Sequence, residues 1–414
     1  MNMLFLCHRI PYPPDKGEKI RAYHMLAHLA QRHTIYLGAF VEDPAEMRYA
    51  AMLREMLGGE CCLVPLGAAA RLNMAAGFVH RAPLSASYFR SRALARWINL
   101  ILRTQNIEVA IVYSTAMAPY LLRQRAFDPR RVIFDMVDLD SDKWRQYGDG
   151  ASGLLAWIYR REMRTLLSLE REAATGFGAT LLVSPHEVGT FVRLAPLARQ
   201  SLWSVPNGVD LNFFSAEHTY SNPFEEGQAA IVMTGTMDYR PNVEGALWFA
   251  NSVLPQIRAR KPEAKFYVVG ARPSREVRAL ECGSIVVTGQ VEDVRPYLAH
   301  AGAVVAPLKL ARGVQNKVLE GMAMSRPVVA TTPAVQALDV TPGHELLVAD
   351  EPGKFADHVL GVMEAPSRVG LNGRRYVEKH HQWAKNLETL DRLVEAVKAQ
   401  NAFGSHSGLA RAAE

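Results

Sequence analysis

Short apolar runs alternate along the chain with longer stretches in which apolar residues recur at helical spacing. Residues 2–7, 34–39 and 61–65 are runs of the kind that form buried strands. The segments between them, 18–32 and 45–57, carry apolar residues on one side only, which is typical of amphipathic helices. Strand, helix and strand in this order predict a parallel sheet covered by helices.

The same pattern starts again in the second half of the chain. Residues 206–210, Pro-Asn-Gly-Val-Asp, are a strong turn signal and the best position for a domain boundary. Beyond it, we expect a helix over 243–260 with one strand before it and one strand after it. Further strands are expected in later apolar runs, and a last helix over 387–400. The class is therefore α/β with two consecutive Rossmann-like domains.

The stretch from 304 to 331 carries the clearest chemistry. An apolar strand ends at Pro307, a polar loop follows, and a helix starts near Asn316. Arg312 and Lys317, together with the loop amides, would stand at the positive end of the helix dipole, which suits a diphosphate. Glu320 is an acid within an otherwise apolar helix face. The plainer interpretation is an ordinary strand–helix–strand unit with a charged loop and a solvated glutamate.

Composition narrows the class of protein. A chain of 414 residues, with 49% hydrophobic and 21% charged residues, has ordinary globular composition and the length of two domains. Residues 1–208 hold 25 basic and 18 acidic residues, a net charge of +7, whereas the remainder holds 22 and 23. The basic half favours an anionic partner such as a membrane surface or a phosphorylated substrate, or is simply a solvated face.

Cysteine spacing and hydropathy favour a reducing compartment and a chain that does not span a membrane. The four cysteines show no metal-binding spacing, and the adjacent Cys61-Cys62 pair is a poor disulfide framework, so we expect a reducing compartment. We expect no signal peptide, because the apolar run over residues 3–6 is too short and a proline-rich segment follows it. We expect no membrane span, because no apolar run approaches 18 residues.

Several features of the first half leave alternatives open. A basic, aromatic helix is predicted over 86–106 and another over 154–175; each is either a peripheral membrane anchor or a helix packed on the sheet. The acidic loop over 135–144 is carboxylate-rich enough for a metal ion, and His24 and His28 have zinc-like spacing, although a packed or surface pair is the simpler interpretation. Basic charge without a nucleic-acid motif argues against nucleic-acid binding.

Three motifs of the second half resemble glycosyltransferase family 4, whose members are retaining enzymes of the GT-B fold. They are Val-Pro-Asn-Gly-Val-Asp over 205–210, Gly-Gln-Val-Glu-Asp over 289–293, and Leu-Glu-Gly-Met-Ala-Met-Ser-Arg-Pro-Val-Val-Ala-Thr over 319–331. Residues 9–21, the 135–144 loop and Gly-Thr-Met-Asp-Tyr-Arg-Pro-Asn over 235–242 further resemble sugar transferases of bacterial exopolysaccharide and PEP-CTERM loci.

The resemblance implies a domain plan. Residues 1–206 would be an acceptor-binding domain and 207–380 a nucleotide-sugar-binding domain, the two sheets facing a central cleft. Residues 381–400 would form a helix that crosses back to the first domain, and 401–414 a disordered tail.

On the donor side, the resemblance assigns roles residue by residue. Glu320 matches the second glutamate of the family's E-x7-E motif and would accept hydrogen bonds from the ribose hydroxyls of the nucleotide. The first glutamate should fall at position 312, where this chain has Arg312. Lys317, Arg312 and Arg240 would stabilise the leaving diphosphate. The further donor-binding residues would be Gly235, Gly289, Val291, Gly313 and Asn316.

On the acceptor side, Gly17 matches the glycine of the loop after the first strand, and Arg21 follows it. The family often carries a histidine after the strand at 132–134, and this chain has none there. Asp138 or Asp140 is therefore expected in an acceptor-side polar or basic role. With Asp138, Lys317 and Arg312 would form the catalytic set.

The function implied is that of a retaining, hexosyltransferase-type enzyme. It would move a sugar from a nucleotide-sugar to a hydroxyl of a glycan or lipid-diphosphate-linked acceptor, without a metal ion or other cofactor. We expect a cytoplasmic protein, peripheral at the anionic inner face of the plasma membrane. The alternatives are a GT-B nucleotide-sugar epimerase and a non-catalytic nucleotide-binding homologue that scaffolds a membrane complex.

Overall fold

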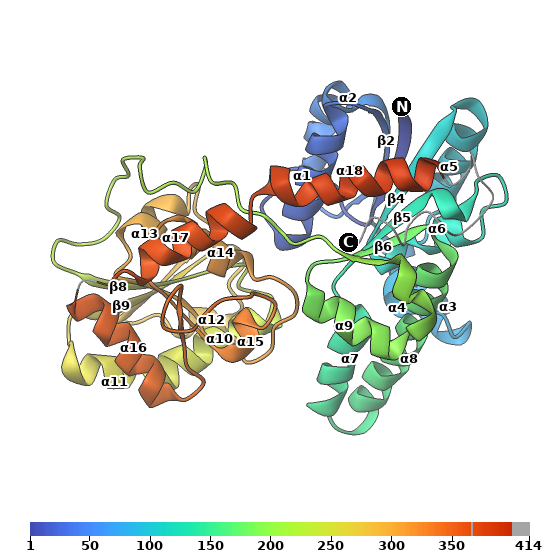
Figure 1. Cartoon of the computed structure of the whole chain (residues 1–414). Helices are drawn as coiled ribbons and strands as arrows, with labels where there is room; N and C mark the ends of the chain where they lie inside the picture. Colours follow the sequence, from blue (N-terminus) through green and yellow to red (C-terminus); the bar gives the residue numbers. More distant parts are fainter. Residues whose placement is uncertain (366, 400–414) are drawn as a thin grey trace. The chain divides into compact units, whose positions relative to one another are not determined.

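The computed structural model describes residues 1–365 and 367–399 (Figure 1). The described chain divides into two compact units. The N-terminal unit comprises Met1–Val205 and the described residues from Leu387 onward, and the C-terminal unit comprises Pro206–Asn386. The tail expected over 401–414 lies outside the described residues.

The N-terminal unit is built on a parallel sheet of seven strands in the order β3-β2-β1-β4-β5-β6-β7. The apolar runs read from the sequence are its strands, and the predicted parallel sheet is confirmed. The strands are β1 (Asn2–Cys7), β2 (Thr34–Val41), β3 (Gly58–Pro65), β4 (Ile107–Tyr113), β5 (Val132–Val137), β6 (Ala179–Leu182) and β7 (Leu202–Ser204).

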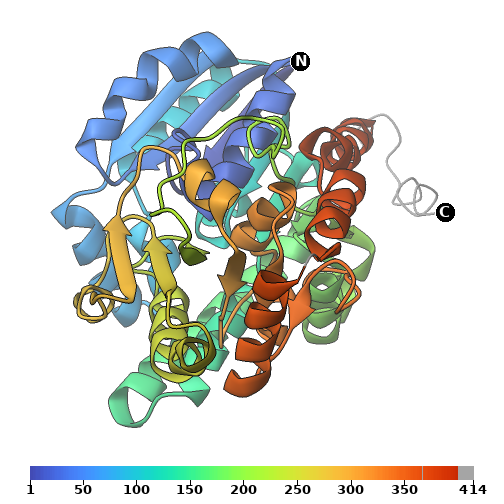
Figure 2. The same cartoon turned by 90° about the vertical axis from the view of Figure 1, so that its left-hand side faces the viewer.

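The order of these strands reverses between β1 and β4. Because crossovers between parallel strands are right-handed, the reversal puts helices on both faces of the sheet (Figure 2). The longer helices are α1 (Gly17–Ala30), α2 (Ala50–Leu57), α3 (Ala68–Val79), α5 (Arg92–Thr104), α7 (Asp140–Asp149), α8 (Gly153–Gly176) and α9 (Pro185–Leu194). Shorter turns of helix are α4 (Leu84–Tyr88), α6 (Pro119–Leu122), η1 (Pro44–Tyr49), η2 (Thr115–Met117), η3 (Pro129–Arg131) and η4 (Pro196–Ser201).

Two predicted elements of this unit were wrong in their limits. The helix expected over 86–106 is broken between Tyr88 and Arg92, where Ser91 caps α5 by accepting a hydrogen bond from Leu94 N. The acidic segment 135–144 is not one loop. Asp135 belongs to β5, and Asp140 begins α7, where acidic side chains suit the first turn of a helix.

The C-terminal unit has a parallel sheet of six strands in the order β10-β9-β8-β11-β12-β13. Here too the order reverses in the middle, between β8 and β11. The strands are β8 (Ala229–Thr234), β9 (Ala264–Val269), β10 (Ile285–Gly289), β11 (Ala303–Ala306), β12 (Val328–Ala330) and β13 (Leu347–Val348).

The helices of the C-terminal unit bury their apolar sides against this sheet. In α14 (Asn316–Ala323), Val318, Leu319, Met322 and Ala323 are fully buried, as their spacing predicts. The helix expected over 243–260 is interrupted by a π-helical turn (η5, Phe249–Val253) just before Pro255, whose missing N–H cannot continue the ladder. The other helices are α10 (Arg240–Trp248), α11 (Leu254–Arg260), α12 (Arg275–Arg278), α13 (Arg295–His300), α15 (Thr332–Val335), α16 (Pro352–Glu364) and α17 (Val369–His380).

The last helix, α18 (Trp383–Ala399), starts in the C-terminal unit and continues on the N-terminal unit. In its second part, Asp391 pairs with His28 of α1 at 2.9 Å and with Arg32 at 2.5 Å. Asp391 thereby fixes α18 to α1. No helix of the described residues is both long and apolar enough to cross a membrane.

A buried ion pair ties α1 to the sheet of the N-terminal unit. Arg21 Nε donates to Asp135 Oδ2 at 2.8 Å, and Arg21 Nη1 donates to the carbonyl of Val205 at 2.8 Å; the side chains of Arg21 and Asp135 are both 0% exposed. Asp135 Oδ1 also accepts from Val137 N at 3.0 Å. A buried charge deprived of its partner is costly, so this pair specifies how α1, β5 and the end of β7 meet.

We therefore expect Arg21→Met and Asp135→Asn each to lower the free energy of unfolding by about 3–5 kcal/mol. A double-mutant cycle in urea should give a coupling free energy of about 1–3 kcal/mol. The control is Arg260→Met, which removes the exposed pair with Asp357 and should cost less than about 1 kcal/mol. Additive effects of the two buried substitutions would contradict the assignment.

Candidate functional site

The donor-side residues gather where the strand order of the C-terminal sheet reverses. The loop after β8 and the loop after β11 leave the carboxyl edge of the sheet side by side, since these two strands are hydrogen-bonded neighbours. Such a reversal opens a crevice at the carboxyl ends of parallel strands, where α/β proteins bind ligands. The first loop carries Gly235, and the second leads into α14 with Lys317 and Glu320.

Lys317 is the centre of this arrangement. Its side chain is 8% exposed, and its Nζ donates to Asn242 Oδ1 at 2.5 Å. Asn242, at the start of α10, in turn donates from Nδ2 to the carbonyl of Thr236 at 2.9 Å. The ammonium of α14 is thus held by a side chain of α10 against the loop that follows β8.

Gly235 lets the loop backbone come this close. Its φ of 146° favours glycine, and a Cβ there would lie 2.8 Å from Asn242 Nδ2 and 3.1 Å from Lys317 Nζ. Gly270, which directly follows β9, packs against the backbone of this loop. The contact is so close that a Cβ on Gly270 would lie 1.7 Å from the carbonyl oxygen of Gly235. The backbone of this loop is therefore packed between Gly270 and the Lys317 side chain.

Burial changes the protonation of both titratable groups on α14. It lowers the pKa of Lys317 to about 8, although the nearby Glu320 carboxylate opposes the fall. Burial likewise raises the pKa of Glu320 to about 7, and Lys317 opposes the rise. A cation that is short of negative charge, one helical turn from a carboxylate acceptor, can receive an anion together with a hydroxyl-bearing group.

The other predicted basic residues lie differently. Arg240 Nε donates to Glu244 Oε1 at 2.6 Å on the exposed side of α10. Arg312 is partly exposed in the loop before α14, and its carbonyl accepts from Gln315 Nε2 at 2.7 Å. Lys317 is therefore the basic side chain that the fold holds directly beside Gly235.

The remaining predicted donor-binding residues take part in backbone turns, in a side-chain hydrogen bond or in the packing of the core. Gly313 and Gly289 have φ values of 60° and 68°, and the carbonyl of Gly289 accepts from Gly270 N at 3.1 Å. Asn316 Oδ1 accepts from Asn207 Nδ2 at 3.4 Å, and Val291 packs against the core of the unit.

In the N-terminal unit, the predicted acceptor-side residues also follow strand ends. Gly17 is exposed at the first position of α1, whereas Arg21 is fully buried in its pair with Asp135. At the end of β5, Val137 has a φ of 68°, which is strained for a β-branched residue. Asp135 holds that strained turn and so positions the segment that carries Asp138.

Buried glutamates surround Asp138 and Asp140. Glu187 Oε2 accepts from Leu139 N at 3.3 Å, and its pKa is raised to about 7 by burial and by the charge of Asp138. Glu170 Oε1 accepts from Ser141 N at 3.0 Å, and burial raises the pKa of Glu170 to about 8. Burial also raises the pKa of Asp140. Burial therefore favours the protonated form of each of these three carboxyl groups.

In the part of the chain that the structure describes, no group of three or more His, Cys, Asp or Glu side chains is placed to hold a metal ion. His28 of the zinc-like pair contacts the Asp391 carboxylate at 2.9 Å, as a surface pair would.

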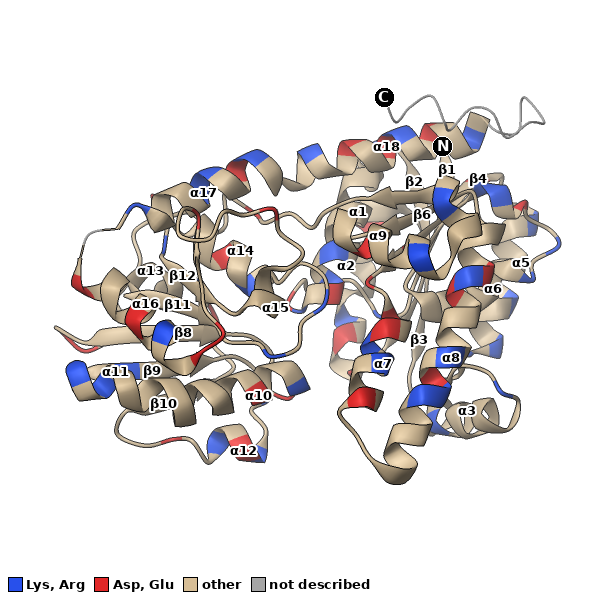
Figure 3. Ribbon diagram, turned by 60° about the horizontal axis from the view of Figure 1, so that its bottom comes forward, with Lys and Arg blue, Asp and Glu red and all other residues tan. Residues whose placement is uncertain are grey.

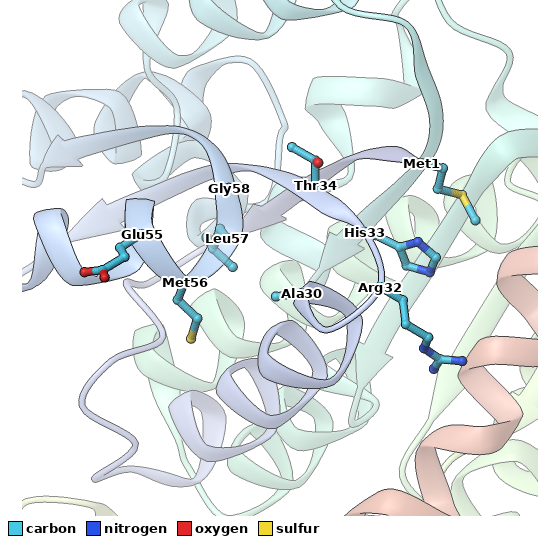
Figure 4. Close-up of a pocket in the computed structure, with 9 residues that line it drawn as sticks. All are labelled: Met1, Ala30, Arg32, His33, Thr34, Glu55, Met56, Leu57 and Gly58. Atoms are coloured by element: carbon cyan, nitrogen blue, oxygen red, sulfur yellow. The ribbon is translucent and has the colours of Figure 1, made fainter.

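A separate hollow in the N-terminal unit lies away from these loops. Figure 4 shows the depression, in which Met1, Thr34 and Gly58 mark the starts of β1, β2 and β3. It therefore opens at the amino edge of the sheet, opposite the carboxyl edge where the predicted residues lie.

Sequence reasoning missed Asn242, Gly270, Glu170 and Glu187. A signal existed for Gly270, since β8, β9 and β10 each run into or end on a glycine. Glu170 falls on the buried stripe of α8, and an acid in an apolar stripe is itself unusual. Asn242 closes the 235–242 motif, but its contact with Lys317, 75 residues further along the chain, left no sequence signal.

Comparison with known proteins agrees with this architecture. Residues 228–365 match the family model described as "Glycosyl transferases group 1". No curated protein matches the chain. Solved structures of the GT-B fold do match, and the fold of this chain is GT-B.

Anabaena HepE, solved in complex with UDP and glucose, has a TM-score of 0.66 at 14% identity, and the match covers 96% of this chain and 100% of that one. Sucrose-phosphate synthase of Thermosynechococcus elongatus has a TM-score of 0.70 at 15% identity, with 96% and 99% covered. WaaG, a glycosyltransferase involved in lipopolysaccharide biosynthesis, has a TM-score of 0.67 at 14% identity, with 94% and 99% covered.

The close packing of Gly270 against the loop after β8 predicts that a methyl group added at Gly270 destabilises the protein. Gly270→Ala should lower the free energy of unfolding by about 3 kcal/mol or more, because backbone has to move. Gly283→Ala is the matched control, since a Cβ there meets nothing within 4 Å; it should cost less than about 1 kcal/mol. Equal urea midpoints for the two variants would contradict this packing.

The buried Glu170 predicts a pH effect of definite sign. Its folded pKa of about 8 lies above the ordinary value of 4.5, so the native state binds its proton more tightly. Stability is therefore lost as pH rises from about 4.5 through about 8. Glu170→Gln should remove that loss. At pH 9 its free energy of unfolding should therefore exceed that of the wild type by a few kcal/mol at most, which a higher unfolding temperature would report. The assignment is refuted if the difference in unfolding temperature between the variant and the wild type is no larger at pH 9 than at pH 5.

Proposed function

We propose that this protein is a retaining glycosyltransferase of family 4 that transfers a hexosyl group from a nucleotide-sugar to a hydroxyl of a glycan or lipid-diphosphate-linked acceptor. The observation that carries the proposal is the buried Lys317 ammonium, held by Asn242 against the Gly235 loop, with Glu320 one turn further along α14. This pairing matches the two halves of a nucleotide, an anionic diphosphate and a ribose diol.

The donor would bind in the C-terminal unit. Its diphosphate would lie against Lys317 and the first amides of α14, where the helix dipole favours negative charge. The ribose hydroxyls would donate to Glu320, whose two oxygens can accept both. HepE was solved with UDP and with UDP-glucose, which supports a uridine diphosphate sugar as the first donor to test.

In the reaction, the bond between the anomeric carbon and the diphosphate oxygen would break, and the acceptor oxygen would bond on the same face of that carbon. The acceptor proton would leave with the departing diphosphate or pass to Asp138. Lys317, with Arg312 from the preceding loop, would stabilise the growing charge on the diphosphate. Electrostatic stabilisation of this kind needs no metal ion.

The acceptor would bind in the basic N-terminal unit, at the loops that carry Gly17 and Asp138. A lipid-diphosphate-linked acceptor at the inner face of the plasma membrane, in exopolysaccharide synthesis, fits that charge. The description of WaaG as a transferase of lipopolysaccharide biosynthesis supports an acceptor of this class.

The test is release of nucleotide by the purified full chain from a panel of nucleotide-sugars, with and without membrane lipid extract. Turnover that requires the extract supports the transferase. Donor turnover without any acceptor points to the epimerase alternative, and binding without turnover points to the non-catalytic one, which Arg312 at the family's glutamate position would explain.

The two pKa values predict a bell-shaped dependence of kcat/KM on pH. Glu320 has to be ionised, so activity should rise through about pH 7, and Lys317 has to be protonated, so activity should fall above about pH 8. Lys317→Met should lower kcat about 100-fold. Glu320→Gln should raise KM and remove the acidic limb, whereas the exposed Glu364→Gln should change neither. An unchanged acidic limb in Glu320→Gln would exclude the ribose role.

A further inference from the structure

Large apolar side chains are exposed together on two neighbouring helix segments of the N-terminal unit. Of the thirteen such side chains that are exposed in the described chain, seven belong to α3 and the first turn and a half of α8. We call them the α3–α8 surface: Leu72, Met74, Phe78, Val79, Leu154, Leu155 and Trp157. Monomeric soluble proteins rarely gather so many in one place without a partner.

The exposure is large for aliphatic residues. Leu72, Val79 and Leu154 are 72%, 77% and 73% exposed. By contrast, α5 buries its apolar stripe of Leu94, Ile98 and Ile101, so of the two alternatives for the helix over 86–106 the structure favours a helix packed on the sheet. The unsatisfied apolar face lies instead on α3 and on the start of α8.

Side-chain contacts join the two segments into one surface. The rings of Phe78 and Trp157 are 5.7 Å apart, and the Arg161 guanidinium lies 4.8 Å from the centre of the Phe78 ring. In Figure 1, α3, α4 and α8 lie side by side.

Polar anchors make this surface rigid. Arg161 Nη2 donates to the carbonyls of Gly77, Phe78 and Ala82, the end of α3 that a cation stabilises. The next residue, Glu162, is 1% exposed and accepts from Leu84 N at 2.8 Å and from Ser85 N at 3.0 Å, capping α4. The apolar side chains are thus held outward by a fixed scaffold and are not a loose loop.

The segment that carries α3, α4 and α5 has charge of one sign, although the exposed Asp149 of α7 lies just before α8. Residues 61–107 contain six arginines and no aspartate or glutamate. All six are exposed: Arg71, Arg81, Arg90, Arg92, Arg96 and Arg103. Arg160 and Arg164 add exposed positive charge on α8, and Figure 3 shows basic residues along α5 and α8. Exposed aliphatic and aromatic side chains on elements rich in arginine suit an apolar phase with an anionic border.

We infer that the α3–α8 surface docks on a bilayer leaflet rich in anionic lipids. Leu72, Val79, Leu154 and Trp157 would enter the boundary between headgroups and acyl chains, and the arginines would pair with lipid phosphates. The inference rests on the proposed function in one respect: docking there would bring the acceptor-binding unit to the leaflet that holds a lipid-linked acceptor.

The experiment is flotation of the full chain with phosphatidylcholine vesicles that contain about one-third phosphatidylglycerol, at low salt and at about 0.5 M salt. Wild type should float with anionic vesicles at low salt and about tenfold less at high salt or with pure phosphatidylcholine. Leu154→Ser/Trp157→Ser and Arg71→Glu/Arg81→Glu should each reduce binding about tenfold or more.

Matched controls lie on η4 of the same unit. Leu197, which is 92% exposed, and Arg199 lie outside the α3–α8 surface, so Leu197→Ser/Arg199→Glu should bind like wild type. Vesicle binding should also shift tryptophan emission to shorter wavelength, and Trp157→Phe should lose most of that shift while it still floats.

Three outcomes overturn the inference: no flotation of wild type at low salt, equal losses in the control and the surface variants, or tight binding to an RNA homopolymer without vesicle binding. Nucleotide release from a donor is measured on the same samples with a water-soluble acceptor. Failure of flotation with intact release refutes only the surface, and flotation without release refutes only the proposed reaction.

Discussion

The ammonium of Lys317 is the constraint on which the arrangement of the C-terminal unit depends. It is buried at the carboxyl edge of the sheet, its proton is bound by Asn242 of α10, and it lies against the backbone of Gly235. A cation in that position needs a hydrogen-bonding partner or an anion, and the fold supplies Asn242 and, one helical turn away, Glu320. Burial lowers the pKa of Lys317, and the Glu320 carboxylate only partly offsets the fall.

The two units solve the problem of buried charge differently. In the N-terminal unit, Arg21 and Asp135 pair directly with each other and fix α1 against β5, although burial still raises the pKa of Asp135. In the C-terminal unit, Lys317 and Glu320 lie one helical turn apart, and burial moves the pKa of each toward neutrality. Such perturbed groups at the carboxyl edge of a sheet mark a candidate ligand site.

The carboxylates beyond β5 form a third kind of arrangement. Glu170 and Glu187 accept backbone N–H groups of the segment that carries Asp138 and Asp140, and burial keeps their pKa values high. The strained φ of Val137, held by Asp135, turns that segment at the strand end. Strain of this sort persists only where surrounding contacts impose it, which is why a positioning role for Asp135 follows.

The sequence by itself determined the two parallel sheets, the restart of the pattern near Pro206, and α14 with its buried face and the acidic Glu320 within that face. Periodicity carries this information because burial on a sheet selects apolar residues at fixed spacing. It did not determine which basic residue is beside the Gly235 loop. Arg240 and Lys317 look alike in sequence, but Arg240 turns to Glu244, and Lys317 meets Asn242.

The prediction of a membrane-binding surface also depended partly on the sequence and partly on the tertiary structure. Amphipathic spacing made the helix over 86–106 look available, yet tertiary packing buries its apolar side and leaves α3 and the start of α8 exposed. The spacing of apolar residues in the sequence indicates that one face of a helix is apolar. Only the fold decides whether another element of the chain covers that face, because the partner comes from residues far away in the sequence.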